Sequence, residues 1–301
     1  MNLNRISKVA LWIFAAIGLF LTGCLSNVSN NEALNVGSYN IRLATGDVGT
    51  PNAWNNRKDD LVDLVKKLDL DVFGMQEVRP EQAKFLRERM PDYEFVGEHR
   101  GADRVSDEAS PVAYRKSRFE KLKSGTFWLS ETPEVPGVKG WGAACPRVCS
   151  YLILRDLQTG KRFCFANTHT DHISALARKN GMLLIIERMK EFGGGVPIVF
   201  TGDHNCRHED EPAQAARELL SDARDIAETK DPGPMNTFQG FGKYKDGPVD
   251  KNGKHFDDYR IDYIYVTPGT RVINFVTHDD KRAGKNLYPS DHYPITATIE
   301  L

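Results

Sequence analysis

The sequence lacks the features that mark a disulfide scaffold, a nucleic-acid binder or a zinc peptidase. Its 301 residues include five cysteines, and none has the CxxC spacing of a structural zinc site. With 40 basic and 41 acidic side chains, the net charge is −1, and no dense run of lysine and arginine provides a field that attracts a polyanion. The GxSxG, Walker and HExxH motifs are also missing. These absences weigh against long nucleic acid as a substrate and against a serine nucleophile.

The one long apolar run lies near the N-terminus, over residues 9–21. It is too short for a comfortable membrane span and has the proportions of a signal-peptide core. It ends in Leu21-Thr22-Gly23-Cys24, which resembles a bacterial lipobox in which Cys24 receives the lipid. A plain secretory signal or an anchor helix is the alternative. We predict a lipoprotein signal peptide over residues 1–24, a polar tether over 25–34 and membrane anchoring at the cell envelope.

The rest of the chain, residues 35–301, shows no second linker and no repeat, and is expected to form one domain and a monomer. Hydrophobic periodicity predicts helices over 56–68, 80–90 and 174–192, and strands over 36–42, 71–77, 150–157, 161–168, 196–201, 260–266, 272–276 and 294–301. Strands and helices mix without strict alternation, and several strands pair as hairpins. This pattern favours an α+β fold of two mixed β-sheets packed face to face with helices outside, a four-layer α/β/β/α sandwich.

Four cysteines remain in the domain: Cys145, Cys149, Cys164 and Cys206. An exported location permits disulfides, but the spacing does not say which form. Buried free cysteines are equally compatible with the sequence.

Polar clusters lie at or just past the ends of apolar strands, at Asn40, Glu77, residues 167–171, residues 202–205 and residues 290–292. In addition, Asp262 lies inside an apolar strand, where its carboxylate needs a partner such as a histidine. Oxygen ligands with few histidines favour Mg²⁺ or Mn²⁺ over zinc. Such an ion can polarise a phosphoryl oxygen while a carboxylate activates water. The clusters therefore predict in-line attack of water on phosphorus.

The ordered set SYNIR, MQE, NTHTDH, TGDHN, RIDYIYV and SDHYP resembles the endonuclease/exonuclease/phosphatase superfamily over nearly the whole chain after the tether. The stretches GTFWLSETPEVPGVKGWGAACPR and TFQGF further resemble its bacterial, often exported subgroup. The resemblance implies a divalent-metal-dependent hydrolase of phosphate esters.

The resemblance also implies a role for each matched position. Glu77 would be the principal metal ligand, with Asn40 beside it and Asp291 completing the metal side. Asp203 would orient or deprotonate the attacking water. Asn205 would donate a hydrogen bond to a phosphate oxygen.

The remaining matched positions are two histidines and one carboxylate. His292 would stabilise charge in the transition state, and Asp262 would fix its tautomer. His169 would contact the phosphate or protonate the leaving group. Each of these residues alone has a structural explanation, as a cap, a turn residue or a buried hydrogen-bonded group. Those explanations do not predict that all six motifs occur together.

Substrate contacts are expected from residues around these motifs. Arg178, one turn into the helix after the NTHTDH motif, could add a bidentate phosphate contact. Trp141 and Phe238 lie in loop-like stretches and are expected to wall a cleft. His204 stands where superfamily members commonly carry an apolar or aromatic residue, and is expected to be a loop histidine at the rim. His172 is expected to support its loop.

The balanced charge favours a compact substrate, such as a nucleotide, a sugar phosphate or a lipid head group. One alternative is an extracellular nuclease, which requires a basic groove along the motif rim. Another is a non-catalytic ligand-binding lipoprotein, against which the intact set of carboxylates and imidazoles argues.

Overall fold

The computed structural model describes residues 32–230, 233–244, 248–249 and 259–301. The predicted signal peptide, Cys24 and most of the tether lie outside the described residues and stay predictions. Residues 32–301 form one compact unit, and its first strand begins at Leu34. Within the described ranges, we find no helix with the length and apolar character needed to cross a membrane.

The domain contains two mixed β-sheets. The first has the order β10 (Thr229–Lys230), β12 (Arg271–Thr277), β13 (Ile295–Glu300), β1 (Leu34–Asn40), β2 (Val72–Gln76), β4 (Val112–Arg115) and β3 (Tyr93–Val96). The second has the order β5 (Phe119–Trp128), β6 (Val148–Asp156), β7 (Arg162–His169), β8 (Ile198–Asp203), β11 (Asp262–Val266) and β9 (Ser221–Asp222). Parallel pairs, such as β1 with β2 and β7 with β8, adjoin antiparallel ones.

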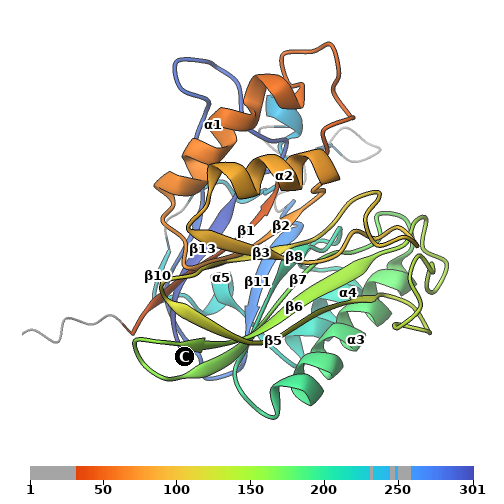
Figure 1. Cartoon of the computed structure of the whole chain (residues 1–301), viewed down its shortest axis with the longest axis vertical. Coiled ribbons are helices and arrows are strands. Elements are labelled where there is room, and N and C mark those ends of the chain that lie inside the picture. Colours follow the sequence, from red (N-terminus) through yellow and green to blue (C-terminus); the bar gives the residue numbers. More distant parts are fainter. Residues whose placement is uncertain (1–31, 231–232, 245–247, 250–258) are drawn as a thin grey trace, which may run out of the picture. The chain divides into compact units, whose positions relative to one another are not determined.

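Helices cover the outer faces of both sheets (Figure 1). The helices are α1 (Trp54–Lys67), α2 (Pro80–Arg89), α3 (Ala175–Gly193), α4 (Glu211–Arg217), the one-turn α5 (Ala223–Ile226) and the 3₁₀ turn η1 (Gly240–Gly242). The first two pack on the first sheet, and α3 packs on β6, β7 and β8 of the second. The predicted four-layer sandwich is confirmed.

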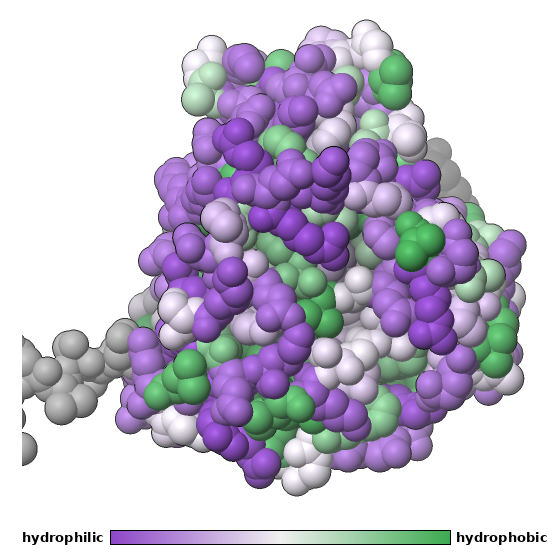
Figure 2. Space-filling model, in the orientation of Figure 1, coloured by the Kyte–Doolittle hydropathy of each residue, from purple (hydrophilic) through white to green (hydrophobic). Residues whose placement is uncertain are grey.

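Three apolar clusters match the three interfaces between these layers. Inward-facing residues such as Val36 and Phe165 fill the space between the sheets. Leu61 joins α1 to the first sheet, and Ile185 joins α3 to the second. On the face shown in Figure 2, hydrophilic residues cover most of the surface and hydrophobic ones form small, separated patches. Apolar side chains therefore account for the stacking of layers.

Local sequence signals account for the predicted elements. At the start of α3 the Ser174 hydroxyl accepts a hydrogen bond from the Ala177 amide, and Gly194 with φ 60° ends the helix. β3, β4, β5 and α4 were not predicted. β3 and β4 are only four residues long, which is too short for a clear hydrophobic period. β5 is an edge strand whose exposed middle lacks apolar alternation.

A buried polar network joins the sheets directly beneath the motif rim. The Gln76 amide donates to Ser38 Oγ at 3.0 Å and to Asn167 Oδ1 at 2.7 Å. The Asn167 amide in turn donates to the Met75 carbonyl at 2.8 Å. A Cβ on Gly74 would lie 2.1 Å from Asn167 Oδ1, so only glycine lets the sheets approach this closely. The network holds β2 against β7 at the level of the site.

Candidate active site

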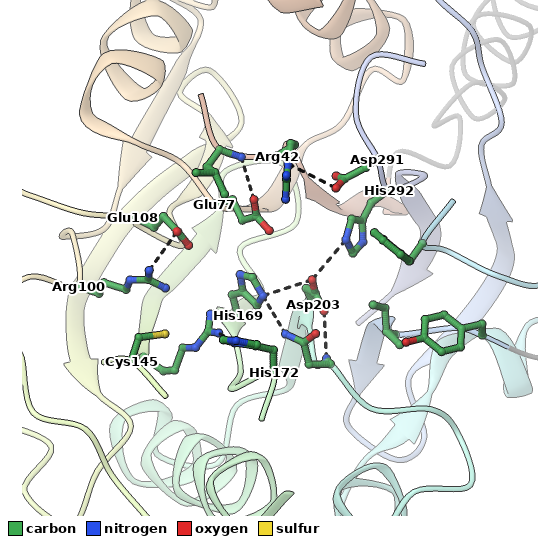
Figure 3. Close-up of a pocket in the computed structure, with 16 residues that line it drawn as sticks. Arg42, Glu77, Arg100, Glu108, Cys145, His169, His172, Asp203, Asp291 and His292 are labelled. Atoms are coloured by element: carbon green, nitrogen blue, oxygen red, sulfur yellow. Dashed lines mark hydrogen bonds and ion pairs between the residues drawn. The ribbon is translucent and has the colours of Figure 1, made fainter. Parts of the chain in front are cut away.

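The polar motifs meet because the strands that carry them end at one rim. Asn40 pairs with Gln76 at the ends of β1 and β2, and His169 pairs with Asp203 at the ends of β7 and β8. Since β11 runs antiparallel to β8, its first residue, Asp262, lies opposite Asp203. Five segments that are far apart in the sequence thus deliver polar side chains to one place, as Figure 3 shows in part.

A cavity of about 580 Å³ opens at this rim. Its volume falls in the range of roughly 300 to 1,000 Å³ that small-molecule sites occupy. The lining residues are Arg42, Leu43, Glu77, Arg100, Glu108, Cys145, Arg147, His169, His172, Asp203, Asn205, Phe238, Tyr259, Ile261, Asp291 and His292. Two further predicted residues, Asn40 and Asp262, lie buried behind these and contact them directly.

Asn40 connects the two carboxylates on which the prediction depends. Its amide nitrogen donates to Glu77 Oε1 at 3.1 Å and to Asp203 Oδ2 at 2.9 Å. The other oxygen of Glu77 accepts the Leu43 amide at 2.8 Å. Glu77 forms no ion pair with an arginine or lysine in the described part of the chain. Glu77, Asp203 and His292 all line the one cavity.

Three residues at this rim have the left-handed backbone that side chains other than glycine rarely adopt. They are Arg42 with φ 57°, Glu77 with φ 62° and Asn205 with φ 47°. Such a conformation costs on the order of 1–3 kcal/mol and persists where the surrounding contacts over-determine it, often at functional sites. Three of the eight described non-glycine residues with positive φ therefore lie within the motifs.

Asp203 lies between two histidines. Its Oδ2 is 3.6 Å from His292 Nε2 and 3.4 Å from His169 Nε2. The far side of the His292 ring, Nδ1, contacts Asp262 Oδ2 at 2.8 Å, as predicted. The Asn205 side-chain amide lies 2.9 Å from His169 Nε2, and its backbone amide donates to Asp203 Oδ1 at 3.0 Å. The carboxylate thus accepts hydrogen bonds from the Asn40 side chain and the Asn205 backbone, and both histidine rings lie close to it.

The two histidines have opposite protonation preferences. Burial lowers the pKa of His292, but the carboxylates of Asp262 and Asp203 outweigh it and raise the pKa to about 10. Burial, reinforced by the guanidinium charges of Arg147 and Arg100, lowers the pKa of His169 well below its ordinary value. Burial and the charge of Asp262 raise the pKa of Asp203 to about 7. At neutral pH His292 is a cation and His169 is neutral.

The charges at this end of the cavity suit a divalent cation. Burial raises the pKa of Asp291, and the nearby charge of Glu77 adds to that effect, so the two carboxylates repel each other. The cations close to this group are Arg42, whose Nε is 3.6 Å from Asp291 Oδ2, the buried Arg57 and the His292 imidazolium. A cation held by oxygen ligands would relieve the repulsion. The residues predicted to hold it are Asn40, Glu77 and Asp291, of which Glu77 and Asp291 line the cavity.

Arg57 is a positioning residue that sequence analysis missed. It projects from α1, is fully buried, and donates to the carbonyls of Ile41 at 2.6 Å, Arg42 at 2.7 Å and Pro289 at 3.0 Å. It therefore ties the loop after Asn40 to the loop before Asp291. Its only sequence signal is an arginine near the start of an amphipathic helix.

Of the three predicted substrate contacts, the structure places one in the cavity. Phe238 lines it and packs edge-on against His292, with ring centroids 5.1 Å apart. Arg178 and Trp141 do not line the cavity. Arg178 donates to the Asp171 carbonyl at 2.9 Å, and Trp141 packs against the apolar cluster under α3. Both stabilise the loop between β7 and α3 and lie away from the cavity that holds Asp203.

The expected rim position of His204 is wrong. The side chain is fully buried and stacks near Phe200, Tyr263 and Tyr265 on the α3 side of the second sheet. Alternate residues of a strand point to opposite faces, so Asp203 faces the cavity and His204 faces the helix layer. The four domain cysteines are free; Cys145 is half-buried in the cavity wall and the other three are buried.

Sequence analysis also missed most of the cavity wall beside His169. It is built by Arg100, Glu108, Cys145, Arg147 and His172, here called the polar wall. These residues lie in loops, where no strand or helix period indicates which way a side chain points. His172 contacts Arg147, with 2.9 Å between its Nδ1 and the Arg147 Nη2, and so supports its loop as expected.

Known proteins share this fold. A model of the Endonuclease/Exonuclease/phosphatase family matches residues 37–292. The solved mannosyl-6-phosphatase of Bacteroides thetaiotaomicron is 33% identical, with a TM-score of 0.79, and the match covers 89% of this chain and 100% of that one. A Bacteroides vulgatus protein of the same family is also 33% identical, with a TM-score of 0.81 over 89% and 99% of the chains. An uncharacterized mimivirus protein is 28% identical over 82% of this chain and 92% of its own.

Proposed function

Since this chain belongs to the endonuclease/exonuclease/phosphatase family, we propose that it hydrolyses a phosphate ester with the help of Mg²⁺ or Mn²⁺. The observation that carries the proposal is the Asn40 amide, which bridges Glu77 and Asp203 while His169 and His292 both face Asp203. Buried carboxylates and imidazoles of shifted pKa, gathered in one cavity, are typical of acid–base catalysis.

In the proposed reaction the oxygen of a water molecule attacks phosphorus and the bond to the leaving-group oxygen breaks, and that oxygen takes up a proton from solvent and leaves as an alcohol. Asp203 accepts the proton of that water, because it is the carboxylate held between the two histidines. The His292 imidazolium donates to a non-bridging phosphate oxygen, and Asp262 holds it in place. A divalent cation, when bound by Asn40, Glu77 and Asp291, would neutralise charge on the phosphate.

Two features support a compact substrate. Among the described residues, the cavity lining combines three arginines with four carboxylates, Glu77, Glu108, Asp203 and Asp291, and so has no excess of positive charge of the kind that a nuclease uses. Its volume of about 580 Å³ suits a molecule the size of a sugar phosphate or nucleotide.

The 33% identity to a protein named a mannosyl-6-phosphatase supports a sugar phosphate.

Hydrolysis of p-nitrophenyl phosphate and bis-p-nitrophenyl phosphate should require Mg²⁺ or Mn²⁺ and stop on addition of EDTA. Glu77→Gln should raise the metal concentration needed for half-maximal rate by about 10–100-fold, because a carboxylate at the metal side is lost. The control is Glu120→Gln, which removes a half-exposed partner of Arg155 on the edge strand β5. Turnover of neither ester with metal, or a Glu77→Gln titration that matches wild type, would refute the proposal.

We propose a lipid-anchored location at the cell envelope on the strength of the Leu21–Cys24 motif alone. Cys24→Ala removes the acceptor thiol, so the variant expressed in a bacterium should leave the detergent-extractable membrane fraction in which the wild type is found. Equal partition of the two proteins would count against a lipid on Cys24.

A further inference from the structure

The polar wall stands across the cavity from the residues assigned to the reaction. In Figure 3, Arg100, Glu108 and Cys145 lie on the opposite side from Asp291 and His292. Arg100 and Glu108 belong to the loop between β3 and β4, whose ends meet in a bridge between His99 and Ala109. Arg147 directly precedes β6. Nothing in the proposed chemistry uses these side chains.

The polar wall is preorganised by its own contacts. Arg100 Nη2 donates to Glu108 Oε1 at 3.0 Å, and the backbone carbonyl of Arg100 accepts the Trp128 indole N–H at 2.9 Å. The side chains of Arg100 and Glu108 are 12% and 13% exposed, and that of Arg147 is 5% exposed. Arg147 is held by His172 and, at 3.5 Å, by Asp171. Groups fixed in this way lose little conformational entropy when they bind a ligand.

The charges of the polar wall do not suit a second phosphate. Asp107 lies 3.1 Å from Arg100, and Asp171 lies behind Arg147. Arg79 also contacts Asp107, at 3.2 Å, so with Glu108 three carboxylates accompany three guanidinium groups. A wall without excess positive charge has no means to offset the cost of desolvating another anion.

The same groups do suit hydroxyls. A carboxylate accepts hydrogen bonds and guanidinium groups donate them, whereas a sugar hydroxyl does both. A nucleobase stacks best on a large aromatic ring, and the polar wall contains no phenylalanine, tyrosine or tryptophan. The cavity's aromatic residues lie on the other side, where Phe238 contacts His292 and Tyr259. The wall thus matches a neutral, hydroxylated group better than a base.

We propose that the polar wall binds the leaving group of the substrate, and that this group is a neutral sugar. Glu108 accepts hydrogen bonds from its hydroxyls, and Arg100 and Arg147 donate to their oxygens. The inference rests on the proposed function, because it takes the phosphate to lie at Asp203 and His292. It makes Glu108 a specificity-determining residue that takes no part in the chemical step.

The test compares hexose 6-phosphates with p-nitrophenyl phosphate, whose leaving group carries no sugar hydroxyl. Wild type should prefer a hexose 6-phosphate in kcat/KM. Glu108→Gln should lower that value about 10–100-fold, the loss expected for hydrogen bonds to a charged group. It should change the value for p-nitrophenyl phosphate less than about threefold, which shows that the protein is folded and its chemistry intact. The matched control is Glu98→Gln, which removes an exposed partner of Arg104 in the same segment.

If Glu108→Gln lowers kcat/KM equally for both substrates, the inference is wrong. It is also wrong if wild type prefers p-nitrophenyl phosphate to a hexose 6-phosphate, or a hexose bisphosphate to the monophosphate. If Glu108→Gln does not fold, Arg147→Lys should show the same selective loss, since lysine cannot reproduce the fixed guanidinium donors. Failure of the proposed function gives a different result, because wild type would then hydrolyse none of these esters.

Discussion

Asp203→Asn is expected to lower kcat by about 10³–10⁴-fold, near the upper end of the effect of losing a general base. Asparagine has nearly the same shape, and its oxygen can still accept the Asn40 amide that Asp203 Oδ2 accepts at 2.9 Å. It cannot accept a proton from water. The measurement is kcat on p-nitrophenyl phosphate with saturating metal.

The free energy of unfolding separates this effect from a folding defect. Burial and the charge of Asp262 raise the pKa of Asp203, so the buried charge at this position costs stability in the folded protein. Asp203→Asn loses the hydrogen bond from the Asn205 backbone to Oδ1, but it also removes this buried charge, so its free energy of unfolding in urea should lie within about 2 kcal/mol of wild type while the variant is inactive. Asp280→Asn, which removes the surface partner of Lys67, serves as the control. Activity above a tenth of wild type would exclude Asp203 as the base.

Asp262→Asn is expected to reduce kcat/KM at neutral pH on the order of 10³-fold and to move the alkaline limb of its pH profile to lower pH. Burial alone lowers the pKa of His292, and the carboxylates of Asp262 and Asp203 raise it to about 10. The substitution removes the negative charge of Asp262 and weakens its 2.8 Å contact with His292 Nδ1. The pKa of His292 then falls, so the imidazolium loses its proton at a lower pH. Wild-type activity should persist until the pH approaches 10.

The control for this shift is a buried carboxylate far from the cavity. Asp156 contacts Arg118 at the other end of the second sheet, 3.4 Å from its Nη2. Asp156→Asn should lower stability but leave the alkaline limb where it is. A limb that does not move in Asp262→Asn would mean that His292 does not act as a cation in the rate-determining step.

The sequence by itself determined the fold class and most of the reactive end of the cavity. Hydrophobic periodicity located α1, α2 and α3, and the polar residues at or next to the ends of apolar strands marked Asn40, Glu77, Asp203 and His292. This works because strands of a sheet end at common rims, so a residue's place at a strand end predicts its place in space. The alternation of side chains along a strand also predicts the buried position of His204, because Phe200, Gly202 and His204 lie on the face opposite Asp203.

Only the tertiary structure decided which loop and helix residues reach the cavity. Arg57 and Arg178 are both arginines near the start of a helix, yet Arg57 spans the loops that hold Asn40 and Asp291, whereas Arg178 turns back to the Asp171 carbonyl. Glu108 and Arg147 line the cavity although no local pattern distinguishes them from surface charges. The direction of a long side chain in a loop depends on partners that are distant in sequence, and those partners come together only when the two sheets pack.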